Sequence, residues 1–271
     1  MLGKLQSAID IIRTVRNWPP ALLDHTGFLT RRYTCEIRDG IRFNVRGGTD
    51  DRHVFFEIFV RDCYGEAKIR PGTTVVDIGA NIGCFTLLAA QRASRVLAFE
   101  PFPPNLEMLR ENVTLNDATN VEIFPLAVGD KQGESVLFIP DNDSFVGRVS
   151  LHPGRGTRTT ECACTTLDQV VMDNGLGKVD LLKIDCQGAE YEILYGASPD
   201  TLGCIRQIIA ECERYDDRPE WSIVALSRYL QNHGFEVRTR HNILYAWRKE
   251  NGDENDTGGT SGKHERIRQR Q

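Results

Sequence analysis

Thr74-Val75-Val76-Asp77-Ile78-Gly79-Ala80-Asn81-Ile82-Gly83-Cys84-Phe85 is the stretch that decides the fold of this sequence. A short, mostly apolar run leads into a turn with two glycines, and apolar residues then follow at helical spacing. A strand, a turn and a helix in this order form the repeating unit of a parallel sheet. Ligands bind at the carboxyl ends of such strands. The turn over residues 79–83 is therefore the first candidate site.

Strands alternate with helices on both sides of this stretch. We predict buried strands at 74–78, 95–99, 121–124, 179–184 and 205–210, and helices at 85–92, 105–116 and 220–232. Two final strands near 235–239 and 243–247 are joined by a short polar turn, so they should be antiparallel. The expected fold is α/β, a Rossmann-like doubly wound sheet, mostly parallel with a C-terminal antiparallel pair. Residues 135–139 and 159–164 look like extended pieces outside this alternation, and 140–158 like a loop over the site.

The regions that flank the alternating part differ from it in pattern. Residues 4–16 place Leu5, Ala8, Ile9, Ile12 and Val15 on one helical face, and a hairpin is expected around residues 39–40. A further helix is expected over 51–64. We therefore divide the chain into an N-terminal helix and hairpin addition (1–50), the main domain (51–249) and a tail (250–271). The tail has too little apolar surface to order itself, so we expect it to be disordered.

Composition excludes several classes of protein. The net charge of −5 argues against a dedicated nucleic-acid binder. Eight cysteines occur without any C-x-x-C pair, and we expect reduced, mostly buried thiols. Nowhere do 18 apolar residues run together, so no transmembrane segment is expected, and we predict a cytoplasmic protein. The oligomeric state stays open.

The turn at 79–83 discriminates among three cofactor classes. A phosphate-binding P-loop needs Lys and Ser or Thr where Cys84 and Phe85 stand. A dinucleotide site needs a glycine where Asn81 stands, and Asp77 is unfavourable beside a pyrophosphate. The same carboxylate favours a cationic ligand such as S-adenosylmethionine. Glu100 ends the next strand, where a carboxylate can accept hydrogen bonds from ribose hydroxyls.

Further motifs extend the pattern along the chain. They are Ala98-Phe-Glu100-Pro101-Phe-Pro-Pro-Asn105, Leu109-Arg-Glu-Asn112-Val-Thr-Leu-Asn116, Thr166-Leu-Asp168, Asp180-Leu-Leu-Lys183-Ile-Asp185-Cys-Gln187-Gly188-Ala-Glu190 and Ile209-Ala-Glu211. In type, order and spacing these motifs resemble the FkbM-type methyltransferases over about residues 50–240. The resemblance implies a seven-stranded class I methyltransferase sheet.

The resemblance also implies an activity and a set of site residues. The activity is S-adenosylmethionine-dependent O-methylation of a hydroxyl on a sugar, glycan or secondary metabolite. The implied cofactor-binding residues are Asp77, Gly79, Ala80, Asn81, Gly83, Glu100, Pro101, Asn105, Ala127, Val128 and Asp185. One departure matters, because the family usually has Glu where this chain has Gln187. Any role of position 187 as a base or metal ligand is therefore in doubt.

A hydroxyl is a poor nucleophile while protonated, so a general base is expected. Asp185 and Glu211 each follow a predicted parallel strand, so both should face the crevice above the cofactor. His53 is a third candidate catalytic residue and His241 a fourth. Asp185 and Glu211 also suit Mg²⁺, but we predict no metal site. Three arginines in the loop at 148–158 suit an anionic acceptor, although a solvated loop is the simpler interpretation.

Three other classes of function stay open at this stage. A nucleic-acid N-methyltransferase normally carries Asn/Asp-Pro-Pro-aromatic after the fourth strand, where this chain has Asp185-Cys-Gln-Gly. A cofactor-binding module without turnover is favoured only by Gln187. A nicotinamide dehydrogenase lacks support from the glycine pattern.

Overall fold

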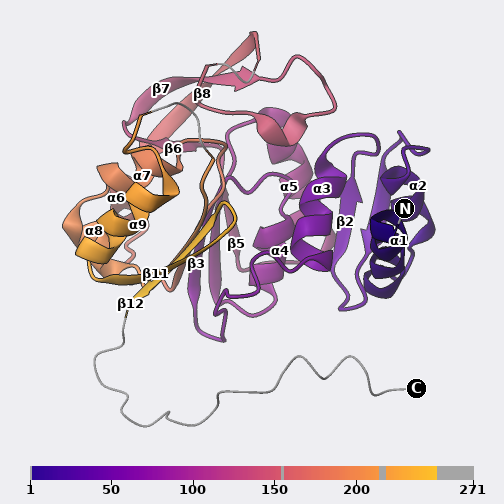
Figure 1. Ribbon diagram of the computed structural model, residues 1–271, viewed down its shortest axis with the longest axis horizontal. Coiled ribbons are helices and arrows are strands. Elements are labelled where there is room, and N and C mark those ends of the chain that lie inside the picture. The colour runs from indigo at the N-terminus through magenta and orange to yellow at the C-terminus, as the bar shows by residue number, and fades with distance from the viewer. Residues whose placement is uncertain (1, 154–155, 214–217, 249–271) are drawn as a thin grey trace.

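The computed structural model describes residues 2–153, 156–213 and 218–248. The predicted tail lies outside these residues. At the centre is a seven-stranded sheet in the order β11-β12-β10-β9-β3-β4-β5 (Figure 1). Its strands are β3 (Thr74–Ile78), β4 (Arg95–Phe99), β5 (Val121–Phe124), β9 (Leu181–Ile184), β10 (Gln207–Glu211), β11 (Phe235–Arg240) and β12 (Ile243–Arg248). Only β12 runs antiparallel to its neighbours, β10 and β11.

Helices cover both faces of this sheet (Figure 1). On one side lie α6 (Leu167–Asp173), α7 (Glu190–Gly196), α8 (Pro199–Cys204) and α9 (Ile223–Asn232), and on the other α4 (Cys84–Ala90) and α5 (Pro103–Leu115). The strands are buried because both faces are covered, as their apolar sequences predict. The fold predicted from the sequence is confirmed.

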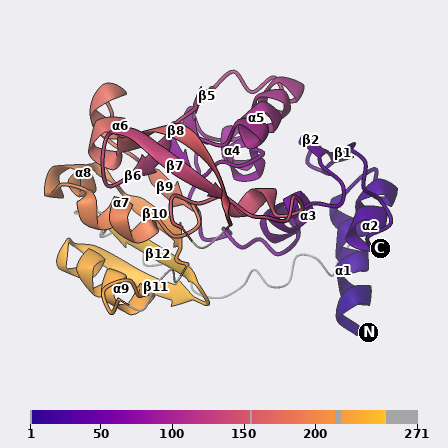
Figure 2. The ribbon, with the colours of Figure 1, turned by 90° about the horizontal axis from the view of Figure 1, so that it is seen from above.

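The N-terminal elements lie beside α4 and α5 (Figure 2). They form α1 (Leu2–Thr14), α2 (Pro19–His25), the predicted hairpin of β1 (Tyr33–Glu36) and β2 (Arg42–Val45), and α3 (Asp51–Phe55). The helix expected over 51–64 is shorter than predicted. After α3 it widens into one π-helical turn, η1 (Phe56–Val60), and ends there.

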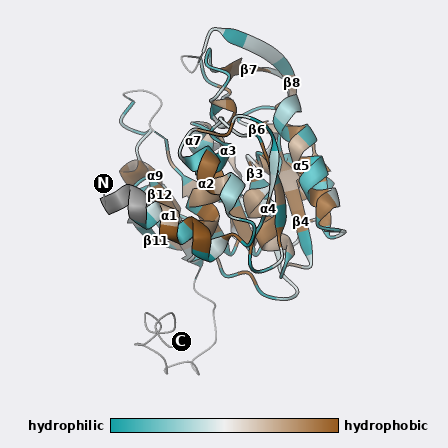
Figure 3. Ribbon diagram, turned by 90° about the vertical axis from the view of Figure 1, so that its right-hand side faces the viewer, coloured by the Kyte–Doolittle hydropathy of each residue, from teal (hydrophilic) through white to brown (hydrophobic). Residues whose placement is uncertain are grey.

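One hydrophobic core runs from the N-terminal elements into the sheet. It joins Val15 and Phe43 to Val75 of β3 and Tyr245 of β12. A second core lies on the opposite face and joins β3, β9 and β10 to helices α6–α9. In Figure 3 the exposed helices carry both hydrophobic and hydrophilic residues, because only one side of each meets a core.

The two extended pieces predicted outside the alternation form a separate sheet. Its order is β6-β8-β7, with β6 (Ala127–Gly129), β7 (Gly133–Ile139) and β8 (Arg158–Thr166). Between β7 and β8 the described part of the loop contains one short 3₁₀ turn, η2 (Val146–Arg148). Within the described ranges, no helix combines the length and apolar character that a membrane span needs.

Candidate active site

The strand order reverses between β4 and β9, on either side of β3. The segments that follow β3 and β9 therefore run in opposite directions along the sheet and leave a crevice between them at its carboxyl edge. Gly79 follows β3 with a φ of 76°, and a Cβ there would collide with the carbonyl oxygen of Asp185, which follows β9. Glycine is required at this position because the two chain segments touch.

The turn after β3 is held by Glu100 at the end of β4. The carboxylate of Glu100 accepts hydrogen bonds from the backbone N–H groups of Asn81 (2.8 Å) and Phe102 (2.9 Å). Burial raises the pKa of Glu100 to about 7, although both N–H groups favour its charged form. Asn81 has a left-handed φ of 52°, and its side-chain oxygen is buried without a hydrogen-bond partner among the described residues.

A cavity of about 340 Å³ opens above this turn. Such a volume suits a small-molecule ligand. The predicted cofactor-binding residues that line it are Gly79, Ala80, Asn81, Glu100, Pro101, Asn105, Ala127, Val128 and Asp185. Three of the four candidate catalytic residues, Asp185, Glu211 and His53, line the same cavity.

Two predicted cofactor residues do not line the cavity. Asp77 is fully buried behind it, where its carboxylate lies 3.0 Å from the ammonium of Lys183 and accepts a 2.6 Å hydrogen bond from Thr86. Gly83 faces helix α5, and a Cβ there would press on Leu109. The expectation that both line the methionine end is therefore corrected: Asp77 pairs with Lys183 behind the cavity, and Gly83 permits close packing of α5.

Lys183 is the functional residue that the sequence reasoning passed over. It is the register partner of Asp77 on the neighbouring strand, is 3% exposed, and donates a 2.8 Å hydrogen bond to the carbonyl oxygen of Gly79. Burial alone would lower the pKa of Lys183, but Asp77 and Asp185 raise it above its ordinary value. The signal was present, since a lysine inside a buried strand needs a carboxylate partner.

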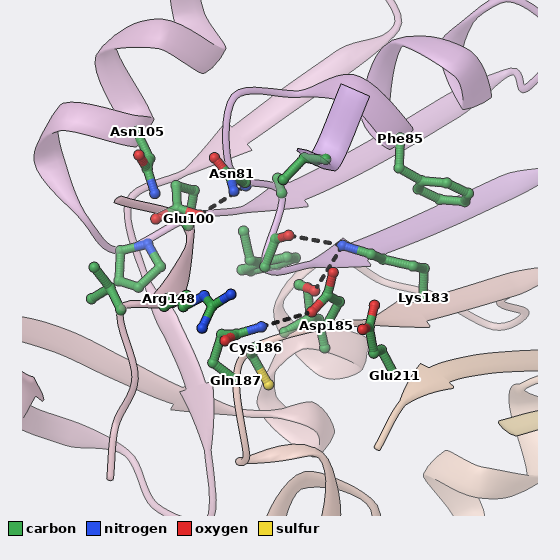
Figure 4. A pocket seen from close by; sticks show the side chains of 18 of the residues that line it. Asn81, Phe85, Glu100, Asn105, Arg148, Lys183, Asp185, Cys186, Gln187 and Glu211 are labelled. Atoms are coloured by element: carbon green, nitrogen blue, oxygen red, sulfur yellow. Dashed lines mark hydrogen bonds between the residues drawn. The ribbon is translucent and has the colours of Figure 1, made fainter. Parts of the chain in front are cut away.

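Asp185 and Glu211 extend from the ends of adjacent parallel strands, and their side chains face each other (Figure 4). The charge of Asp185, followed by burial, raises the pKa of Glu211 to about 8. Asn242 donates a 3.0 Å hydrogen bond to Glu211, and Gln187 approaches Asp185 with a donor distance of 3.5 Å. The charge of Asp185 thus favours the protonated form of Glu211, an arrangement suited to acid and base chemistry.

The loop after β9 has a fixed, unusual backbone. Gln187 has a φ of 61° and Gly188 a φ of 119°. The buried carboxylate of Glu190 accepts hydrogen bonds from the N–H groups of Cys186 (2.9 Å) and Gly188 (3.0 Å). From the loop between β7 and β8, Ser150 donates a 2.7 Å hydrogen bond to the carbonyl of Gln187. This loop therefore presents the Gln187 side chain to the cavity at a defined position.

The loop between β7 and β8 covers the cavity and is fastened to α3 and α5. The carboxylate of Asp50 accepts a 3.0 Å hydrogen bond from the N–H of Gly147. The backbone N–H of Asp50 donates to the carbonyl oxygen of Ser144 at 2.8 Å. Asn105 donates to the carbonyl of Val146 at 3.0 Å. Burial raises the pKa of Asp50.

The remaining predicted residues take different places. His53 lines the cavity, and burial together with Arg52 lowers its pKa. His241 instead borders a second cavity beside Trp221. Of the loop arginines, Arg148 lines the main cavity, and Arg158 lies 2.7 Å from Asp143. The third, at position 155, lies outside the described residues.

The cavity wall is acidic. Its carboxylates are Asp50, Glu57, Glu100, Asp185, Glu211 and Glu213, against the cations Arg148 and Lys183. This excess fits the sulfonium and ammonium of S-adenosylmethionine, and the unpartnered Asn81 oxygen can accept a hydrogen bond from such a ligand. No cluster of three or more His, Cys, Asp or Glu side chains suited to a metal occurs among the described residues.

A seven-stranded sheet of this order, with a glycine turn after its central strand and a cavity at the switch point, defines a Rossmann-like methyltransferase. The sequence model described as the methyltransferase FkbM domain matches residues 77–237, more than half of the chain. The chain belongs to the FkbM methyltransferase family.

Relatives of known name are similar to this chain over different lengths. AMB antimetabolite synthetase AmbE of Pseudomonas aeruginosa is 32% identical over 235 residues, 72% of this chain and only 11% of AmbE. The 31-O-demethyl-FK506 methyltransferase FkbM of Streptomyces tacrolimicus is 29% identical, covering 79% of this chain and 92% of that protein. Hexuronic acid methyltransferase AglP of Haloferax volcanii is 28% identical, covering 50% and 54% respectively. The chain thus spans about a tenth of AmbE's length and most of FkbM's.

Proposed function

We propose that this protein transfers a methyl group from S-adenosylmethionine to a hydroxyl of a sugar, glycan or secondary metabolite. The observation that carries the proposal is the Asp185 and Glu211 pair, which faces the cavity beside the glycine turn. The relatives support an oxygen acceptor, because the names of FkbM and AglP describe a demethylated oxygen site and a hexuronic acid.

We place the S-adenosylmethionine site at the cavity-lining residues that were predicted from the sequence. When bound, S-adenosylmethionine supplies a methyl group on a sulfonium, and its loss leaves S-adenosylhomocysteine. Gly79, Ala80 and Asn81 would hold the methionine end, and Ala127 and Val128 the adenine. Glu100 would hold the ribose, since each carboxylate oxygen can accept more than the one backbone bond that it already has.

The chain's own groups then handle the acceptor proton. Asp185 or Glu211, which both face the cavity, would take the hydroxyl proton as general base. His53, whose lowered pKa keeps it neutral, is the alternative base. Apolar residues in and next to the small sheet and its loop (Leu126, Leu137, Val149 and Leu151) also line the cavity and would limit water beside the reacting groups.

The test is methyl transfer to a panel of hydroxylated sugars and metabolites, followed by mass spectrometry of the products and release of S-adenosylhomocysteine. Of the variants Asp185→Asn and Glu211→Gln, the one that replaces the true base should slow turnover by about 10²–10⁴-fold, the usual contribution of general-base catalysis. Cofactor affinity should change much less in Glu211→Gln. Near-full turnover in both variants would move the base to His53, and methylation confined to nitrogen acceptors would overturn the proposed acceptor class.

A further inference from the structure

Asp185 has a partner from outside the region that defines the family. The hydroxyl of Tyr64 donates a 3.2 Å hydrogen bond to Oδ2 of Asp185, while Gln187 approaches Oδ1. Tyr64 is 4% exposed and does not line the cavity, so it reaches the site only through Asp185. It precedes residue 77, where the match to the family begins.

The segment around Tyr64 is fixed to the sheet on both sides of that residue. Tyr245 donates a 2.6 Å hydrogen bond to the carbonyl of Cys63. The side-chain amide of Gln207 accepts from the N–H of Lys68 (3.0 Å) and donates to the carbonyl of Glu66 (2.9 Å). The Tyr64 ring packs edge-on against Phe85, 5.2 Å between centroids. Its hydroxyl therefore has a defined position.

The groups around the two carboxylates differ in kind. Asp185 faces two donors and the buried ammonium of Lys183, as well as the thiol of Cys186 and the carboxylates of Glu57, Glu190 and Glu211. Glu211 has one donor, Asn242, and otherwise faces like charges: Asp185, Glu57 and Glu213. The thiol of Cys63 lies near both. Donors and a cation stabilise a charged carboxylate, and Asp185 has one donor more than Glu211 and the Lys183 ammonium beside it.

We propose that Tyr64 is a positioning residue that fixes Asp185 as the proton-accepting member of the pair, so that Glu211 holds the shared proton. The Tyr64 hydroxyl donates to one oxygen of Asp185 and leaves the acceptor hydroxyl to meet the carboxylate from the cavity side. The catalytic meaning of this arrangement rests on the proposed function, but the arrangement itself does not depend on a bound acceptor.

The experiment follows the ¹³C resonances of the side-chain carboxyl groups against pH in the full chain, with Asp185→Asn and Glu211→Gln as assignment variants. Glu211 should titrate near pH 8 in the unaltered protein. In Tyr64→Phe the midpoint of Glu211 should fall by about one pH unit, because Asp185 loses a donor and competes better for the proton. The acidic limb of the turnover pH profile should move to higher pH in Tyr64→Phe, because Asp185 must be charged to accept the proton.

The matched control is Tyr33→Phe, which removes a buried hydrogen bond of the same type from Tyr33 to Asp24 (2.8 Å), far from the pair. It should leave the Glu211 midpoint unchanged. An unchanged midpoint in Tyr64→Phe, or titration of Glu211 near 4.5 in the unaltered protein, would overturn the inference. Calorimetry with S-adenosylmethionine separates the two proposals. If the cofactor binds but the pH titration of Glu211 fails, only this inference is overturned. If the pH titration of Glu211 succeeds but the cofactor does not bind, the proposed function is overturned.

Discussion

Two oppositely charged side chains, Asp77 and Lys183, are buried together in the central sheet. Asp77 and Lys183 are register partners on β3 and β9, and almost no water reaches either. Lys183 also holds the carbonyl of Gly79, which links the pair to the turn that lines the cavity. At the residue scale, the pair therefore ties the stability of the sheet to the geometry of the site.

Replacing one member of this pair should be costly. Lys183→Met leaves Asp77 buried and unpaired, so the free energy of unfolding should fall by about 3–5 kcal/mol in chemical denaturation. Lys178→Met is the matched control, since Lys178 pairs with Asp180 but is 56% exposed, and its loss should cost about 0–1 kcal/mol. Equal losses of unfolding free energy in both variants would mean that the buried pair contributes no more to stability than the exposed pair.

Glu190 predicts how stability depends on pH. Burial raises its pKa from 4.5 to about 7, so between these values the folded protein keeps a proton that the unfolded chain has lost. The contribution is present below pH 4.5 and is lost as the pH rises through 7. Glu190→Gln should flatten the decline of the unfolding free energy across pH 5–7 by up to about 1.4 kcal/mol per pH unit. An unchanged slope would show that Glu190 is ionised in the folded protein.

Single residues show what sequence patterns can and cannot predict. Asp185 and Glu211 at the cavity wall followed from the strand ends, because parallel strands place their carboxyl ends at one edge. Other lining residues, such as Ala127 and Val128, followed only from the resemblance to the family. Asp77 was misplaced because a strand position gives no information on whether a side chain points to a ligand or to a neighbouring strand. Tyr64 carries no motif at all, and only the folded segment brings it to Asp185.

Elements were easier to predict than their exact faces and ends. The hairpin over 33–45 and the seven strands of the main sheet follow from turn residues and apolar runs. In α1, however, Ile11 is buried and Ile12 is 37% exposed, so the predicted face was partly wrong, although Val15, one residue after the helix, is buried as predicted. Several faces of a helix this apolar look alike in sequence, and the choice depends on where β1 and β2 lie. The π-helical turn had no sequence signal that we recognised.

The loop over the cavity gives a prediction at the scale of elements. Asp50→Ala removes the carboxylate that holds the N–H of Gly147, so the Gly147 amide should exchange with solvent roughly 3–10-fold faster, as the loss of one hydrogen bond predicts. Asp141→Ala is the control, because Asp141 holds Thr157 on the other side of the same loop. Hydrogen exchange resolved by residue checks both. Equal rates for Gly147 in Asp50→Ala and the unaltered protein would show that other contacts hold the loop closed.

At the scale of the whole molecule, the N-terminal addition shares its core with the sheet. Phe43 is fully buried between Phe55 and Phe59, with ring centroids 6.5 and 5.0 Å away. Phe43→Ala should lower the free energy of unfolding by about 3–5 kcal/mol. The transition should stay single in thermal unfolding followed by both near- and far-UV circular dichroism. Two separate transitions would show that residues 1–50 fold as a unit of their own.

The cavity beside the glycine turn should bind S-adenosylmethionine, and the proposed function depends on this binding. The most direct test is calorimetric titration of S-adenosylmethionine into the full chain and into Asn81→Gly, which keeps the left-handed backbone but removes the unpartnered side-chain oxygen. We expect one S-adenosylmethionine site per chain in the unaltered protein. The affinity should be about 5–10-fold weaker in Asn81→Gly, because one hydrogen bond is lost. Absence of binding to the unaltered chain would contradict the proposed function.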